Sequence, residues 1–518
     1  MTDLIIKLAM LIVFFGVMVG IGLYCRRHAT DVNGFVLGGR SVGPWLTAFA
    51  YGTSYFSAVV FVGYAGQFGW KYGIAATWAG LGNAFLGSLL AWAVLGRRTR
   101  VMTQHLDSAT MPEFFGKRFG SKALKLCASV IIFIFLIPYT ASLYNGLSRL
   151  FAMAFDIDYS VCVIVMAVLT GIYVIAGGYM ATAINDFIQG IIMIFGISAV
   201  ILAVLKGQGG FLQALQNLAQ VSDETVSSAP GVFASFFGPD PVGLLGVVLL
   251  TSLGTWGLPQ MVQKFYAIKS ESAINKGMII STIFAVIVAG GCYFLGGFGR
   301  LFSDKIDIAA GGYDSVIPTM LSGLPTLLIA VVVILVLSAS MSTLSSLVLA
   351  SSSTLTLDFI KDNMIKNMDE KRQVRWMRSL VVVFIVISVV LALIQYKSSV
   401  TFIAQLMGVS WGALAGAFLA PFLYGLYWKR TTKAACAVSF LFSTVVMLAN
   451  IFARASFPAL LQSPINCGAF CMIAGLVIVP VVSLITKAPA SERVEKVFSC
   501  YNRQVTVSVK DSIGEQTN

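Results

Sequence analysis

The chain has 518 residues, of which 58% are hydrophobic and only 11% are charged, and its formal net charge is +13. This composition excludes a soluble globular domain and is typical of a protein that crosses the membrane many times. Two histidines and eight scattered cysteines also leave few residues for a metal centre or an acid–base enzyme site.

The apolar segments predict an all-α polytopic membrane protein with thirteen spanning helices. We expect these spans at about residues 3–25, 44–68, 74–96, 123–154, 160–180, 183–206, 241–262, 276–299, 324–350, 379–396, 401–427, 432–453 and 466–486. Arg26 and Arg27 follow the first span, whereas a cleavable signal peptide carries its positive charge in front of the apolar segment. We therefore expect the first span to remain as an anchor with the N-terminus outside.

Most lysines and arginines fall in segments that this arrangement places on the cytoplasmic side. Lys264, in the loop expected after the seventh span, is one of them. The positive-inside rule therefore explains the basic pI of about 9.3 without a nucleic-acid partner. We expect an integral protein of the plasma (cytoplasmic) membrane with one membrane domain at 1–486, a cytoplasmic tail at 487–518 and no obligate protein partner.

Two of the expected spans are interrupted by glycine, proline and polar residues. The second span contains AYGTSYFSA at 50–58, and the seventh contains TSLGTWGLPQ at 251–260. Five spans separate their starts. Broken helices at corresponding positions of two halves indicate a transporter built from inverted repeats, with solute and ion held near the membrane midplane. The alternative is a proline kink in one helix and a polar packing seam in the other.

Eleven serine and threonine residues crowd positions 338–356, directly after the apolar run 327–337. Four of them share one helix face: Ser338, Ser342, Ser345 and Ser346. Neutral hydroxyl oxygens at membrane depth suit a small alkali cation. Small-residue helix packing, with hydroxyls bonded back to their own helix, explains the same run.

Four segments, in this order, resemble motifs of the sodium:solute symporter family. They are LGGRSVGPWLTA (37–48), GGYMATAINDFIQG (177–190), MSTLSSLVLASSSTLTLDF (341–359) and APFLYGLYWKRTTKAA (420–435). The resemblance covers about residues 5–486. It implies a fold of the leucine-transporter type, in which two five-helix inverted repeats, at about 44–206 and 241–427, are flanked by extra helices at 3–25, 432–453 and 466–486.

The resemblance implies a sodium site between the second and ninth spans. Thr53, Phe56 and Ala339 match family positions that offer backbone carbonyls, and Ser342 and Thr343 match positions that offer hydroxyls. Five neutral oxygens hold a monovalent cation without burying a carboxylate, and the ends of broken helices strengthen the field. Sodium is then the co-transported ion and the only metal expected, and no organic cofactor is implied.

Asp186, near the cytoplasmic end of the sixth span, is the most conspicuous carboxylate within the spans. By resemblance it is a coupling residue on the path by which sodium leaves. The alternative is a carboxylate at a helix start that accepts first-turn N–H groups. Whether it lies at membrane depth or at the interface stays open.

Candidates for a solute pocket lie on the two broken helices: Tyr55, Ser57, Thr251, Thr255, Trp256 and Gln260. Tyr55, Thr251 and Thr255 replace residues of the family's proline carriers (Asp, Trp and Tyr), whereas Val60 and Pro259 replace residues of its sugar carriers (Gln and Asn). We expect an amino acid such as proline, or an organic acid such as pantothenate or a monocarboxylate.

A sugar or another polar metabolite is the alternative within the same class. An ion channel needs a selectivity element repeated around an axis, and no such repeat occurs. A membrane enzyme is disfavoured because the spans lack paired histidines, cysteines or acids.

Overall fold

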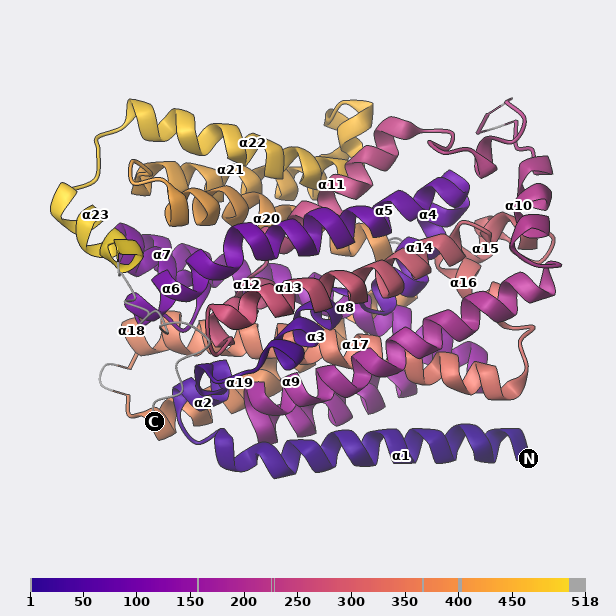
Figure 1. Ribbon diagram of the computed structural model, residues 1–518, viewed down its shortest axis with the longest axis horizontal. Helices are drawn as coiled ribbons and strands as arrows, with labels where there is room; N and C mark the ends of the chain where they lie inside the picture. The colour runs from indigo at the N-terminus through magenta and orange to yellow at the C-terminus, as the bar shows by residue number, and fades with distance from the viewer. Residues whose placement is uncertain are drawn as a thin grey trace, which may run out of the picture.

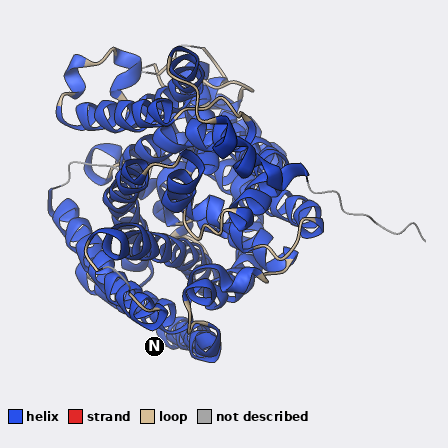
Figure 2. Ribbon diagram, turned by 90° about the vertical axis from the view of Figure 1, so that its left-hand side faces the viewer, coloured by secondary structure: helices blue, strands red, loops and turns tan. Residues whose placement is uncertain are grey.

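The computed structural model describes residues 2–155, 158–224, 226–227, 229–365, 368–398 and 403–502. Within these residues the protein is a bundle of helices whose longest members run along the long axis of the molecule (Figures 1 and 2). The described chain contains no strand and only two isolated β-bridges, Val42–Ile268 and Asp223–Ser227. The expected all-α architecture is therefore confirmed.

The α-helices follow one another in this order: α1 (Thr2–Cys25), α2 (Val32–Leu37), α3 (Pro44–Tyr55), α4 (Ala65–Tyr72), α5 (Thr77–Gly82), α6 (Arg97–His105), α7 (Met111–Phe119), α8 (Lys122–Phe155), α9 (Tyr159–Gly207), α10 (Phe211–Gln220), α11 (Pro241–Gly257), α12 (Pro259–Ala267), α13 (Ser272–Ala285), α14 (Gly291–Gly296), α15 (Ile308–Gly311), α16 (Val316–Leu321), α17 (Thr326–Thr354), α18 (Lys361–Asn363), α19 (Glu370–Ser398), α20 (Ile403–Tyr427), α21 (Lys433–Phe452), α22 (Pro464–Ile485) and α23 (Ser491–Phe498). Short π-helical segments extend several of them, among them η3 (Val59–Tyr64), η5 (Asn83–Leu90) and η11 (Leu355–Ile360).

Ten described helical runs are long and apolar enough to span a membrane, or eleven if α11 and α12, bent by 46°, form one span. This is fewer than the thirteen spans expected. Two long runs each contain a glycine with positive φ, Gly73 (φ 62°) and Gly178 (φ 56°). Glycine adopts this conformation at little cost, so the chain changes direction close to the two places where neighbouring spans were expected to meet.

Helices α17 and α20 lie at the centre of the bundle and are buried over most of their length. Helix α1 lies along one side (Figure 1), and many of its apolar side chains are exposed. The glycines of α11 allow close contact with α20. A Cβ on Gly257 would lie 2.8 Å from Ala415 Cα, so only glycine fits where these two helices pack.

The two ends of the bundle differ. One end carries α2, α6, α7, α18 and α23 (left in Figure 1) and is called the α7 end below; the opposite, α10 end carries α10, α15 and α16. At the α7 end, Val42 N donates to Ala267 O at 3.3 Å and Lys269 N donates to Val42 O at 3.0 Å. Arg40 adds a hydrogen bond from Nη1 to Tyr266 O at 3.2 Å. These bonds join the segment before α3 to the end of α12.

Candidate functional site

Helix α3 breaks in the middle of the bundle. It ends at Tyr55, and Phe56 has an extended backbone (φ −93°, ψ 117°). Beyond the break, Ala58 N donates to Ser340 Oγ of α17 at 3.3 Å, and Val59 N donates to Ser57 Oγ at 3.2 Å. The last carbonyls of a helix have no partner within the helix. The break therefore leaves oxygen acceptors facing α17.

Two hydroxyls of α17 meet these carbonyls. Ser342 Oγ donates to Thr53 O at 3.0 Å and lies at the same distance from Ala339 O. Thr343 Oγ1 lies 3.0 Å from Thr53 O, 3.2 Å from Phe56 O and 3.1 Å from Ala339 O. All five side chains are buried. The structure thus brings together the five oxygens that the family resemblance singles out, and no carboxylate lies among them.

Other hydroxyls of the same run bond to their own helix. Ser345, Ser352 and Ser353 donate to the carbonyls of Ser342, Leu349 and Ala350 at 2.9, 3.2 and 3.2 Å. Such local bonds are typical of serine in buried helices and need no ligand. The hydroxyl-rich run therefore includes a compact group facing the α3 break and residues whose bonds stay within α17, while Ser346 contacts Ser54 of α3 and Lys264 of α12.

Asp186 lies within α9, eight residues after Gly178, and its side chain is 0% exposed. Neither carboxylate oxygen accepts a hydrogen bond, so the interpretation as a helix-start cap is wrong. Its Oδ2 lies 3.7 Å from Lys264 Nζ. Lys264 is 2% exposed, which corrects its assignment to a cytoplasmic loop. Helix α12 continues beyond the expected span to Ala267, and the break at Leu258 directs it along the bundle.

The solute-pocket candidates separate into two groups. Thr251 bonds to Val247 O of its own helix, and Thr255 Oγ1 and Trp256 Nε1 donate to carbonyls of η5, each at 2.9 Å. Among the candidates whose side chains are described, Gln260 alone has a buried polar group without a hydrogen-bond partner. The side chain of Tyr55 lies outside the described part of the structure.

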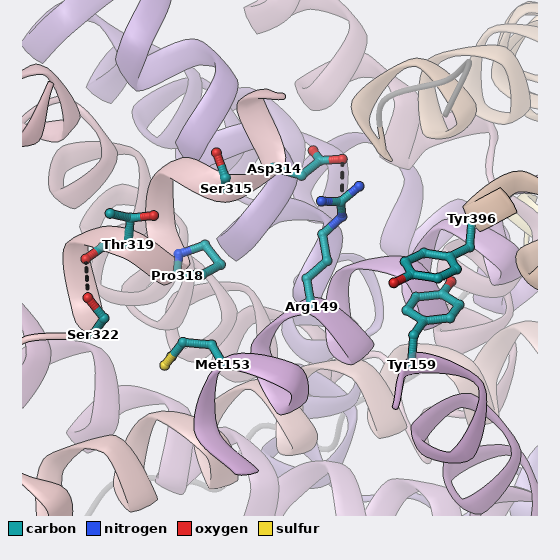
Figure 3. Close-up of a pocket in the computed structure, with 9 residues that line it drawn as sticks. All are labelled: Arg149, Met153, Tyr159, Asp314, Ser315, Pro318, Thr319, Ser322 and Tyr396. Atoms are coloured by element: carbon teal, nitrogen blue, oxygen red, sulfur yellow. Dashed lines mark hydrogen bonds and ion pairs between the residues drawn. The ribbon is translucent and has the colours of Figure 1, made fainter. Parts of the chain in front are cut away.

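A cavity of about 370 Å³ opens at the α10 end. Figure 3 shows Arg149 pointing toward Asp314 across it, with the rings of Tyr159 and Tyr396 beside them. Arg149 Nε lies 3.8 Å from Asp314 Oδ2, which also accepts Ile403 N at 3.3 Å. Burial raises the pKa of Asp314, while Arg149 and the Ile403 N–H oppose the shift. No motif predicted this cavity; the single arginine near the end of the apolar α8 was the signal for it.

Comparison with known proteins gives these features a context. The model of the sodium:solute symporter family matches residues 35–442, which is most of the chain. The chain belongs to the sodium:solute symporter family. Membership makes it a membrane transporter coupled to sodium, and not an enzyme.

Its curated relatives include two bacterial proline carriers. The osmoregulated proline transporter OpuE of Bacillus subtilis (strain 168) is 28% identical over 482 residues, covering 92% of this symporter and 94% of the relative. The sodium/proline symporter of Staphylococcus aureus (strain JH9) is 28% identical over 450 residues, covering 85% and 84%. Both alignments extend over most of the chain.

A solved structure supports the fold. The substrate-bound, outward-open state of a Na⁺-coupled sialic acid symporter superposes with a TM-score of 0.75, covering 94% of this chain and 98% of that one. The two sequences are 16% identical, so this likeness concerns the fold and not the solute. The symporter therefore shares the overall helical fold of that structure.

Proposed function

We propose that this protein imports a small organic solute together with sodium by alternating access. An amino acid such as proline is our first choice, and an organic acid such as pantothenate or a monocarboxylate comes next. The two proline carriers among the relatives, aligned over most of both chains, support this order. A sugar or another polar metabolite is the alternative solute within the same class.

The convergence of five oxygens between α3 and α17 carries the proposal. We assign sodium to Thr53 O, Phe56 O, Ala339 O, Ser342 Oγ and Thr343 Oγ1. Hydroxyls that donate to carbonyls still direct oxygen lone pairs at a cation. The C-terminal end of α3 adds a negative field, because helix C-termini carry about half an elementary negative charge. A sodium ion there would hold the broken helix against α17.

The solute is assigned to the region of the two helix breaks. Gln260, directly after the break between α11 and α12, has a buried amide free to donate to a carboxylate or to accept from an amine. Phe56 and Trp256 would contact the apolar part. Thr251 and Thr255 already use their hydroxyls within the protein, which leaves few directional groups for a polyol and favours a small solute.

We place the α7 end in the cytoplasm, the N-terminus outside and the C-terminus inside. The arginines at the α7 end support this orientation through the positive-inside rule. Division of the long helical runs at Gly73 and Gly178, with α11 and α12 taken as one span, is consistent with thirteen spans and two five-helix repeats in one membrane domain. Asp186 then lies between the sodium site and the cytoplasm, on the proposed ion path.

A ligand-stabilisation screen tests the function. Purified protein is heated with proline, other amino acids, pantothenate, short carboxylates or sugars, each in sodium and in choline. A ligand that binds only the folded protein raises the unfolding temperature according to its affinity. The transported solute should stabilise more in sodium than in choline. Stabilisation by solutes that does not depend on sodium would contradict the proposed coupling.

A further inference from the structure

We infer that the ammonium group of Lys264 is a built-in cation, occupying a second cation position beside the proposed sodium site. In this arrangement no sodium ion binds between Asp186 and Ser346, and each transport cycle carries one sodium. The inference rests on the proposed function and adds a sodium stoichiometry to it.

The surroundings of Lys264 are those of a cation site. Its Nζ lies 3.0 Å from Ser346 Oγ and 3.7 Å from Asp186 Oδ2, and 5.0 Å from the centre of the Tyr179 ring. A carboxylate, a hydroxyl and an aromatic face are all groups that stabilise positive charge. Because the lysine is 2% exposed and the aspartate 0%, water does not replace these contacts.

This position is next to the sodium site along α17. Ser346 follows Ser342 by four residues, which corresponds to a rise of about 6 Å in an α-helix. Ser346 Oγ also lies 2.9 Å from Ser54 Oγ, and Ser54 directly follows Thr53 of the sodium site. The ammonium therefore contacts α17 about one helical turn from the proposed sodium ion, at a serine that also bonds to α3.

Lys264 differs from a mobile ion because it is attached to α12. Through Ser346 and Asp186 it joins α12 to α17 and α9. A buried charge needs a partner of opposite sign. Removal of the lysine therefore leaves the negative charge of Asp186 without its partner, near the hydroxyl oxygen of Ser346. A sodium ion is the simplest replacement. A purely structural ion pair, by contrast, would leave no new ion site when it is removed.

Equilibrium binding of ²²Na⁺ to the purified full-length protein separates these two cases. Wild-type protein should bind one sodium per chain, and K264A and K264Q should bind two. K264A/D186N should return to one, since the carboxylate that attracts the second ion is gone. K276A removes an exposed lysine of α13 and should bind one, as the wild type does.

Two results would overturn the inference: a wild-type protein that binds two sodium ions, or K264A and K264Q variants that still bind one. If neither Lys264 variant can be purified as a monodisperse protein, the number of sodium ions bound by the wild type decides the question. One ion supports the inference and two contradict it. A wild-type protein that binds no sodium would contradict the proposed function itself. Unchanged binding by the Lys264 variants would contradict only the inference about Lys264.

Discussion

Thr343 Oγ1 donates a hydrogen bond to the carbonyl oxygen of Phe56 at 3.2 Å, although 287 positions separate the two residues in the sequence. The contact exists because Phe56 leaves the helical conformation at the end of α3. A continuous helix would have used this carbonyl within its own turn. The broken helix and the hydroxyl-rich helix therefore form one site.

The close contact between α11 and α20 predicts that alanine substitutions at two glycines will differ sharply in their effect on stability. In G257A the new Cβ would lie 2.8 Å from Ala415 Cα and from Leu419 N. Because both are backbone atoms, we expect a loss of about 1–3 kcal/mol in the free energy of unfolding. A Cβ on Gly290 meets no atom within 4 Å, so G290A should be neutral or slightly stabilising. Thermal unfolding in detergent measures both, and equal losses would contradict the packing described.

Substitution of Gln260 should change the KM for the solute and not the KM for sodium. Loss of one hydrogen bond to a charged solute group costs about 1.5–3 kcal/mol, so Q260A should raise the solute KM at least about tenfold. The KM for sodium should change little. Gln213 is exposed on α10, and Q213A provides the control. An unchanged solute KM in Q260A would remove Gln260 from the proposed pocket.

Arg40 should hold together the segments around Val42 and Lys269 at the α7 end. Its guanidinium donates to Tyr266 O at 3.2 Å and to Ser108 O at 2.7 Å. R40M removes these bonds, so we expect amide hydrogen exchange to rise about tenfold or more in the segments around Val42 and Lys269. R27M, which removes an exposed arginine just after α1, should leave this exchange unchanged. Equal protection in R40M and wild type would show that Arg40 does not hold the two segments together.

Asp314 should make stability depend on pH. Burial raises the pKa of its carboxyl in the folded protein, so the folded state binds this proton more tightly than the unfolded state, where the pKa is about 3.9. The stabilisation that the proton provides is complete below the unfolded pKa and is lost as the pH rises through the folded value. D314N should therefore show a smaller fall in unfolding temperature from pH 4 to pH 7 than wild type. A steeper fall in D314N would mean that the ionised carboxylate is the stabilised form.

The break in α3 and the hydroxyl face of α17 could be predicted from the sequence because their signals are local, whereas the pairing of the two helices was implied only by the family resemblance. A helix break shows as glycine, proline and polar residues, and a hydroxyl face shows as the spacing of Ser342 and Ser346. Two neighbouring spans were expected to meet close to Gly178. The structure has a glycine with positive φ there, within a single helical run from Tyr159 to Gly207 that counts as one span by length.

The sequence did not predict contacts that depend on how one helix turns toward another. Lys264 follows an apolar span, as a cytoplasmic lysine would, and only the bend between α11 and α12 buries it beside Asp186. Arg149 and Asp314 belong to segments 165 positions apart, and no motif connects them. No motif indicates the hydrogen bond from Thr255 Oγ1 to Gly87 O of η5.

In the proposed function, the oxygens of Ser342 and Thr343 couple sodium to the movement of the solute. The most direct measurement is uptake into proteoliposomes of the solute found in the stabilisation screen, with radiolabelled proline tested first. Wild-type uptake should follow an inward sodium gradient and stop when choline replaces sodium. S342A/T343A should need at least about tenfold more sodium for half-maximal uptake, because about 1.4 kcal/mol of binding free energy is a factor of ten.

S352A/S353A removes two hydroxyls that bond only within α17 and should behave like the wild type. This variant controls for the loss of hydroxyls in the same helix. Wild-type uptake that proceeds equally in choline would contradict sodium coupling, and an S342A/T343A variant with the sodium dependence of the wild type would contradict the assignment of sodium to these two hydroxyls.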